Sequence, residues 1–312
     1  MKIGFVGCGA IASCYARYLV KNHEVCALDT SAPVIEAVRK NGILVEDWIP
    51  GQGKGNVITV RPAMATTDPK GIGVVDLLVV FVHYQYLEAA VRNALPMIDA
   101  HTMIMCLQNG LGNYDEIAKG VPEEQIIIGN TAFGATPVAP GHVKHTGVGV
   151  TNMGSLKAPM EKVEAVAEAL RSSGLEVSVH ENVMNTIWHK LVANVAINGM
   201  SALLETKNGF VNGNQYAHEA ARMLVEEAIR VANACGCTLD HDAELEHAYE
   251  VSRNTDETIS SMVQDVQHHR ETEIRIITVA VCRLGREHNI PTPCNDLLLQ
   301  LVLAKQSIYL GR

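Results

Sequence analysis

The chain begins with Lys2-Ile3-Gly4-Phe5-Val6-Gly7-Cys8-Gly9-Ala10-Ile11-Ala12, an apolar run that leads directly into a glycine-rich turn and a helical pattern. This G-x-G-x-x-A spacing is typical of the strand–turn–helix unit that binds dinucleotides. Gly7 permits the tight turn, Gly9 lets the backbone approach a pyrophosphate, and the small Ala12 lets helix pack on strand. The helix N-terminus then offers free N–H groups and a positive dipole end to the phosphates. We therefore assign cofactor binding to Gly7, Cys8, Gly9, Ala10 and Ile11.

A second apolar strand, Glu24-Val25-Cys26-Ala27-Leu28, ends in Asp29. An acid at this place accepts hydrogen bonds from both ribose hydroxyls of NAD and repels the 2′-phosphate of NADP. A glycine-rich turn without a ligand is the alternative, but strand, turn, helix and acid occur here in the order that binding requires. The sequence thus predicts NAD as the cofactor.

The composition excludes several classes of protein. The chain has 312 residues with a net charge of −9, and no basic stripe that would attract nucleic acid. It has no apolar run of eighteen residues and no signal peptide, so we expect a cytoplasmic protein without membrane contact. The eight cysteines are scattered, and neither they nor His268-His269 show the spacing of metal ligands. We expect no metal and no disulfide framework.

The pattern of apolar residues changes near residue 180. Residues 1–180 alternate strands and helices, with near-continuous apolar runs at 74–82 and 103–107 that are typical of buried parallel strands. We expect a surface loop around 47–55 and antiparallel strands from 126 to 154 that close the far edge of the sheet. Residues 181–312 are helical, with expected helices at 182–203, 217–234, 243–251, 273–287 and 295–306. The fold class is an α/β Rossmann-type domain followed by an all-α C-terminal domain, with the active site in the cleft between them.

Three polar residues share one face of the expected helix 182–203. Lys190, Asn194 and Asn198 are spaced by four residues, beside the apolar Leu191 and Val195. A lysine and two asparagines in one stripe suit a polar, anionic small molecule. A solvated helix face is the alternative, but asparagine is a mediocre helix former and contributes nothing to such a face.

A second polar cluster contains Ser261 and Glu273. The Ser261 hydroxyl can serve a substrate carboxylate, and Glu273 opens an otherwise apolar stretch. Taken alone, Glu273 is most simply interpreted as an acid at a helix start that interacts with the helix dipole.

Seven short motifs are spread over essentially the whole chain. They are Gly7-Cys8-Gly9-Ala10-Ile11, Gln108-Asn109-Gly110-Leu111-Gly112-Asn113, Gly141-His142-Val143-Lys144-His145-Thr146-Gly147, Trp188-His189-Lys190-Leu191 with Asn194 and Asn198, Ser261-Met262-Val263-Gln264-Asp265, Arg270-Glu271-Thr272-Glu273-Ile274 and Gly285-Arg286-Glu287-His288-Asn289-Ile290-Pro291. Any single motif is modest evidence, but their order and spacing are specific. Together they resemble the ketopantoate reductase family (2-dehydropantoate 2-reductase and relatives).

The resemblance implies a role for each site residue. Lys190 matches the lysine that protonates the developing alkoxide, and Glu273 matches the acid that holds the hydroxyl and orients the lysine. Asn109 matches a residue near both nicotinamide and substrate. The groups that bind the hydroxyl and carboxylate ends of the substrate match Asn194, Asn198 and Ser261. Hydride addition to a carbonyl needs such a cation beside the oxygen.

The chain departs from the family where the family binds the 2′-phosphate of NADPH. The family has an arginine just past the second strand, whereas this chain reads Leu28-Asp29-Thr30-Ser31. His83 stands where the family has a lysine after a later strand, so we place it at the cofactor. The chain thus lacks both cationic side chains that would bind the 2′-phosphate and has the acid Asp29 nearby, so we expect it to use NADH rather than NADPH.

NAD use in this frame resembles the D-mandelate dehydrogenase branch of the same superfamily. We therefore expect an enzyme, an NAD-dependent (R)-2-hydroxyacid dehydrogenase for C3-branched or aromatic 2-keto acids. Ketopantoate reductase proper is the alternative, and a non-catalytic NAD-sensing protein is the alternative of another class. The expected partners are the small-molecule acid and a second copy of the chain in a homodimer. The apolar helix 295–306 fits such an interface, although core packing is the simpler interpretation.

Overall fold

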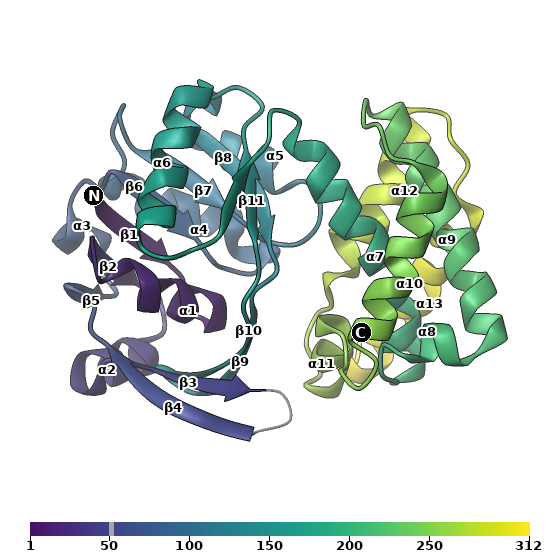
Figure 1. Ribbon diagram of the computed structural model, residues 1–312, viewed down its shortest axis with the longest axis horizontal. Coiled ribbons are helices and arrows are strands. Elements are labelled where there is room, and N and C mark those ends of the chain that lie inside the picture. The colour runs from purple at the N-terminus through teal and green to yellow at the C-terminus, as the bar shows by residue number, and fades with distance from the viewer. Residues whose placement is uncertain (50–52) are drawn as a thin grey trace. The chain divides into compact units, whose positions relative to one another are not determined.

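A computed structural model describes residues 1–49 and 53–312 (Figure 1). The chain divides into two compact units, which are described separately. The first unit contains Met1–Gln108 and Asn113–Val183, and the second contains Asn109–Gly112 and Met184–Arg312. The sequence places a single boundary at 180–181, whereas the structure also assigns the short segment Asn109–Gly112 to the second unit.

The first unit is built on an eight-stranded sheet with the order β12-β11-β8-β7-β6-β1-β2-β5. Neighbouring strands are parallel except β8 and β11, which are antiparallel. The strands are β1 (Lys2–Val6), β2 (Glu24–Leu28), β5 (Met64–Thr66), β6 (Leu77–Val80), β7 (Met103–Cys106), β8 (Ile126–Thr131), β11 (Thr151–Gly154) and β12 (Val177–Val179). The central strands β6 and β7 are buried along their whole length, as expected for parallel strands covered on both faces.

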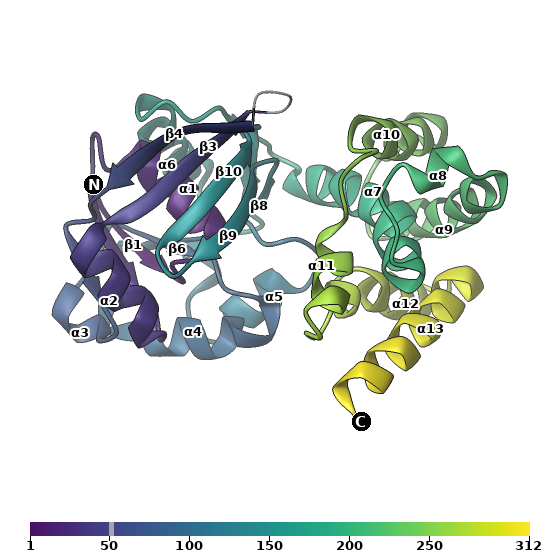
Figure 2. The same ribbon diagram turned by 90° about the horizontal axis from the view of Figure 1, so that it is seen from below.

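Helices cover both faces of this sheet. Figure 2 shows α1 and α6 on one face and α4 on the other. Side chains of α1 and α6 form one apolar core with β1, β6 and β7. The helices of this unit are α1 (Ala10–Leu19), α2 (Ala32–Asn41), α3 (Pro69–Ile72), α4 (Leu87–Ala94), α5 (Asn113–Ala118) and α6 (Met160–Ser172). The layered arrangement confirms the predicted Rossmann-type domain.

A second sheet of four strands corrects two expectations. Its order is β4-β3-β10-β9, with β3 (Ile43–Ile49), β4 (Gly53–Val60), β9 (Gly134–Ala139) and β10 (His142–Gly147). The expected loop at 47–55 is wrong where β3 and β4 extend into it, and residues 50–52 lie outside the described residues. The strands at 134–147 do not close the main sheet. Strand β10 pairs with β3, because Val45 and Val143 bury a common apolar face near α1, and β9 pairs with the other edge of β10.

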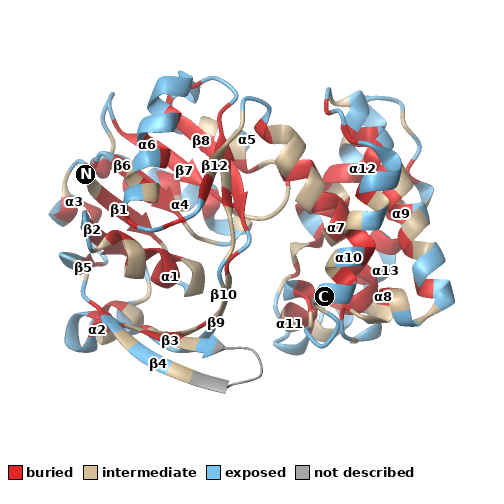
Figure 3. Ribbon diagram, in the orientation of Figure 1, coloured by how far each residue is buried: buried red, intermediate tan, exposed pale blue. Residues whose placement is uncertain are grey.

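The second unit consists of helices, and this confirms the predicted all-α domain. They are α7 (Val183–Leu204), α8 (Phe210–Gly213), α9 (Gln215–Ala234), α10 (His241–Asn254), α11 (Ser261–Gln267), α12 (Thr278–Glu287) and α13 (Pro293–Leu310), with a 3₁₀ turn η4 (Glu273–Arg275). Trp188 and most of its neighbours on α7 are buried in the core of this unit. Figure 3 shows much of α7 in the red of buried residues. Within residues 1–49 and 53–312, no helix is both long and apolar enough to cross a membrane.

Four of the five predicted helices in the second unit begin one or two residues away from the predicted start, and one begins five residues later. The expected helix 273–287 begins only at Thr278, because Glu273 lies in the separate turn η4. The last helix begins at Pro293 rather than residue 295, since a proline is tolerated in the first turn, where its missing N–H is not needed.

Candidate active site

The glycine-rich turn has the shape that a pyrophosphate needs. Gly7 has a φ of +92°, and a Cβ there would lie 2.7 Å from the carbonyl oxygen of Phe81. Gly9 caps α1 with extended backbone and no side-chain hydrogen bond to the helix. Among the described residues, and apart from its chain neighbours and the adjacent helix backbone, no heavy atom lies within 4 Å of the position that a Cβ on Gly9 would take. The N-terminus of α1 therefore faces open space, which fits a phosphate group.

Asp29 is held beside this turn by two backbone donors. Its Oδ2 accepts a hydrogen bond from the Cys8 N–H at 2.7 Å, and its Oδ1 accepts one from the Ser31 N–H at 2.8 Å. Each carboxylate oxygen has a second lone pair for another donor, so the anchored group fits ribose hydroxyls. His83 is exposed and begins the turn after β6. Burial and the nearby Asp29 raise the pKa of the Cys8 thiol, so it stays protonated and is no nucleophile.

The stripe on α7 is largely removed from water. Lys190 and Asn194 are half-buried, and Asn198 is only 6% exposed. The neighbouring Leu191 and Val195 are buried in the core of the second unit. These three polar residues therefore do not form a fully solvated helix face.

Glu273 brings two of the other site residues together. Its Oε2 accepts a hydrogen bond from Ser261 Oγ at 3.2 Å and one from Asn109 Nδ2 at 3.4 Å. Asn109 belongs to the short segment of the second unit in which the Leu111 N–H donates to the carbonyl of Ile276 at 3.0 Å. Three segments that are distant in sequence thus converge on one carboxylate. The Ser261 hydroxyl, expected at a substrate carboxylate, contacts Glu273 in this structure.

Lys190 and Glu273 interact electrostatically. Burial lowers the pKa of Lys190 to about 8, and the negative charge of Glu273 opposes that shift. Glu273 lies in a three-residue 3₁₀ turn, which is too short for the helix-dipole role that its sequence position suggests. An amine that titrates near neutral pH beside a carboxylate is suited to proton transfer.

An ion pair without a predicted role joins the end of α11 to the segment before Glu273. Arg270 donates to Asp265 Oδ1 through Nε at 3.2 Å and Nη2 at 3.0 Å. Asp265 is buried near the end of α11, while Arg270 lies beyond the following turn. In the sequence, only the opposite charges of Asp265 and Arg270 indicate this ion pair. The pair cannot be predicted without the conformation of the turn between the two residues.

Two family models together match most of the chain. The family model "Ketopantoate reductase PanE/ApbA" matches residues 3–158, and "Ketopantoate reductase PanE/ApbA C terminal" matches residues 182–306. A 2-dehydropantoate 2-reductase of Pyrococcus horikoshii is 32% identical and covers 99% of this chain and 98% of its own. The 2-dehydropantoate 2-reductase of Halobacterium salinarum is 31% identical, and the match covers 98% of this chain and 99% of that enzyme. A structure of D-mandelate dehydrogenase with NADH and anilino(oxo)acetate superposes with a TM-score of 0.88 at 29% identity, covering 99% of both chains.

Proposed function

Because the chain belongs to the ketopantoate reductase family, we propose that it is an NAD-dependent (R)-2-hydroxyacid dehydrogenase that reduces C3-branched or aromatic 2-keto acids. The family comprises oxidoreductases that act on the CH–OH group of 2-hydroxy acids. The observation that carries the proposal is Asp29, anchored at the end of β2 where an NADPH enzyme needs cations. The likeness to a D-mandelate dehydrogenase studied with NADH supports it.

In the proposed reaction, different residues bind the cofactor, transfer the proton and orient the substrate. The turn Gly7–Ile11, with Asp29 and His83, would hold NADH, which supplies a hydride to the keto carbon when bound. Lys190 donates its proton to the keto oxygen as negative charge develops there, and its ammonium charge stabilises that oxygen until transfer is complete. Glu273 keeps Lys190 charged and accepts a hydrogen bond from the product hydroxyl. The substrate is oriented by Asn109, Asn194, Asn198 and Ser261.

Two other functions compete with this one. The Pyrococcus and Halobacterium relatives are named 2-dehydropantoate 2-reductases, which favours reduction of ketopantoate to (R)-pantoate as the second candidate. A non-catalytic NAD-sensing protein would have no need of the Lys190–Glu273 pair, which this chain retains.

A panel of initial rates tests the proposal. We would measure reduction of ketopantoate, benzoylformate and 2-ketoisovalerate, each with NADH and with NADPH, by absorbance at 340 nm. We expect benzoylformate or 2-ketoisovalerate with NADH to give the highest kcat/KM. A preference for ketopantoate by orders of magnitude would replace the proposal by the second candidate, and no turnover of any substrate would support the NAD sensor.

We further propose that the enzyme is a homodimer with α13 in its interface. Leu297 and Leu301, one turn apart on α13, are 63% and 44% exposed, while Leu298 and Leu299 on the same helix are buried. We expect light scattering to give twice the mass of the chain, and the double variant Leu297→Lys with Leu301→Lys to halve it, because charges in an apolar interface are costly. Met223→Lys, at an exposed apolar residue of α9, is the matched control and should remain dimeric. A concentration-independent monomer for the unmodified chain would contradict this assembly.

A further inference from the structure

The residues just before Glu273 have little regular structure of their own. Helix α11 ends at Gln267, His269 has a left-handed backbone with a φ of +52°, and residues 270–272 belong to no helix or strand. The position of Glu273 therefore depends on contacts that this segment makes with other elements.

The last turns of α13 supply those contacts. Gln306 Oε1 accepts two hydrogen bonds from Thr272, one from the N–H and one from the hydroxyl, both at 2.9 Å. Gln306 and Thr272 are only 5% and 6% exposed, so this double contact is shielded from water. It fixes the backbone one residue away from Glu273.

Two neighbouring residues of the same helix end extend this support. The Tyr309 hydroxyl donates to the carbonyl of Arg270 at 2.7 Å, and its ring stacks on the ring of His269 at 5.5 Å. Arg312, just beyond α13, donates to Glu271 Oε1 at 2.7 Å. Four consecutive residues, 269–272, are thus each held from the C-terminal end of the chain.

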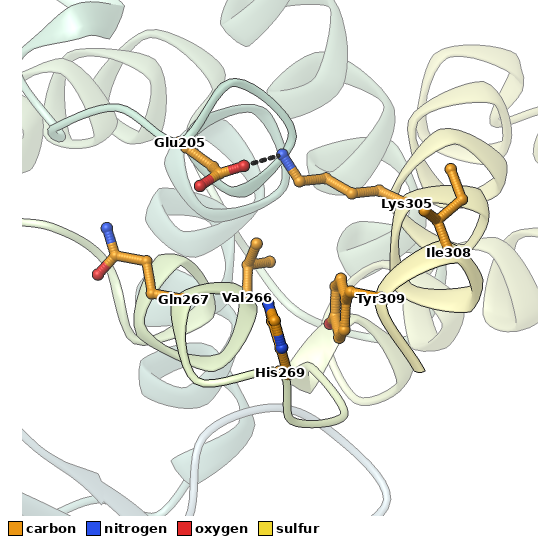
Figure 4. Close-up of a pocket in the computed structure, with 7 residues that line it drawn as sticks. All are labelled: Glu205, Val266, Gln267, His269, Lys305, Ile308 and Tyr309. Carbon is orange, nitrogen blue, oxygen red and sulfur yellow. Dashed lines mark hydrogen bonds and ion pairs between the residues drawn. The ribbon is translucent and has the colours of Figure 1, made fainter. Parts of the chain in front are cut away.

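Helix α13 is itself firmly placed. At its N-terminal end, the buried carboxylate of Glu227 accepts hydrogen bonds from the N–H groups of Cys294 and Asn295 at 2.9 and 3.0 Å. Near its C-terminal end, Lys305 Nζ donates to the carbonyl of Leu203 and to Glu205, both at 2.8 Å. Figure 4 shows this ion pair and the stacked rings of His269 and Tyr309 around a cavity of about 380 Å³. Lys305 contacts α7 and its end, so it supports α13 without bonding to residues 269–272.

We propose that Gln306 is a positioning residue for Glu273, acting through Thr272. The proposal rests on the proposed function, in which Glu273 works with Lys190. Without the Gln306 acceptor, a buried N–H and a buried hydroxyl of Thr272 lose their partner, so the segment must move to satisfy them. The bonds from Glu273 to Ser261 and Asn109 are already 3.2 and 3.4 Å long, and they have little room to lengthen. A displacement of about 1 Å in a catalytic group can cost on the order of 100-fold in rate.

The test compares two variants. Gln306→Met keeps the side-chain length but removes the hydrogen-bond acceptor, whereas Gln306→Glu keeps the acceptor. We expect Gln306→Met to lower kcat for the preferred keto acid by roughly 10- to 100-fold, and Gln306→Glu to stay within roughly threefold of the unmodified enzyme. NADH affinity, measured by fluorescence, should be unchanged in both. The falling alkaline limb of the pH profile should move to lower pH in Gln306→Met, because Glu273 then no longer raises the pKa of Lys190 as effectively.

Two controls separate positioning from general stability. Lys305→Met removes the hydrogen bonds of α13 to Leu203 and Glu205 rather than those to residues 269–272, and it should leave kcat and the pH profile in place. Equal losses in Lys305→Met and Gln306→Met, or an unchanged rate and pH profile in Gln306→Met, would overturn the proposal. Should Gln306→Met fail to fold, Thr272→Val removes one of the two donors and Thr272→Ser keeps both; the same contrast in rate is expected between them.

One measurement does not depend on turnover. Hydrogen exchange of peptides that cover residues 268–276 should be faster in Gln306→Met than in Gln306→Glu. If Gln306→Met exchanges faster but the unmodified protein reduces no keto acid, Gln306 still holds this segment in place and the proposed function is rejected. Unchanged exchange together with normal turnover would reject the role of Gln306 alone.

Discussion

Replacing Lys190 by alanine is expected to lower kcat for keto-acid reduction by about three orders of magnitude or more, while NADH still binds. The variant loses both the proton donor and the cation that stabilises the developing alkoxide. Each tenfold loss corresponds to about 1.4 kcal/mol of transition-state stabilisation, and the two roles together account for about 4 kcal/mol or more. Single-turnover rates and NADH fluorescence titration measure the two quantities separately.

Lys190→Arg is the matched control for this variant. Arginine keeps the positive charge but does not release a proton near neutral pH, so the charge effect remains and the acid is lost. We expect its rate to lie between those of the unmodified enzyme and Lys190→Ala. Near-normal turnover of Lys190→Ala would show that another group donates the proton.

The pKa of Lys190, about 8, fixes the sign of the pH dependence in this same test. Reduction needs the protonated amine, so its rate should fall as the pH rises through about 8. Oxidation of the hydroxy acid needs the neutral amine, so its rate should fall as the pH drops below that value. Both pH-dependent decreases in rate should disappear in Lys190→Arg. A decrease that persists in this variant would reflect the titration of another group.

The second large effect is the choice of cofactor: kcat/KM with NADH should exceed that with NADPH by about 100-fold or more. In the proposed binding mode, the 2′-phosphate of NADPH would bring negative charge beside the Asp29 carboxylate, and the stretch Leu28–Ser31 and His83 offer no lysine or arginine to balance it. Initial rates with both cofactors at subsaturating concentration measure the ratio. Comparable values for the two cofactors would refute the role of Asp29.

Two variants test which charge decides this preference. Asp29→Asn removes the repulsion and should improve kcat/KM with NADPH by about 10-fold while lowering it with NADH. The Cys8 and Ser31 N–H groups both bond to this side chain, so a melting curve must accompany the kinetics. His83→Lys adds a cation at an exposed residue without disturbing that anchor, and it should improve use of NADPH alone.

The local parts of this molecule could be predicted from the sequence. The turn at Gly7 and Gly9 could be predicted because two glycines at this spacing, between an apolar strand and a helical pattern, are a local signal. The buried parallel strands and the amphipathic helices follow from periodicities of two and 3.6 residues. The i, i+4 spacing likewise suffices to place Lys190, Asn194 and Asn198 on one face of α7.

Contacts between distant segments could not be predicted. Strand β3 pairs with β10, and Leu44 lies opposite His142 in that register. Short glycine- and proline-containing strands such as β9 carry little local signal, so their residues alone indicate only a surface loop or a strand at the edge of the main sheet. Their pairing depends on an apolar face shared with α1, which only the folded chain brings together.

The sequence by itself determined the nucleotide-binding turn, the acid at Asp29 and the identity of the candidate acid–base residues, because each is a matter of residue type at a short spacing. Only the tertiary structure decided that Asn109 and Ser261 both reach Glu273, and that Gln306 supports the segment before it. It alone also set the pKa of Lys190, since that value reflects burial and a carboxylate more than eighty residues away in the chain. Desolvation and charge act through space, and a spacing along the chain does not record them.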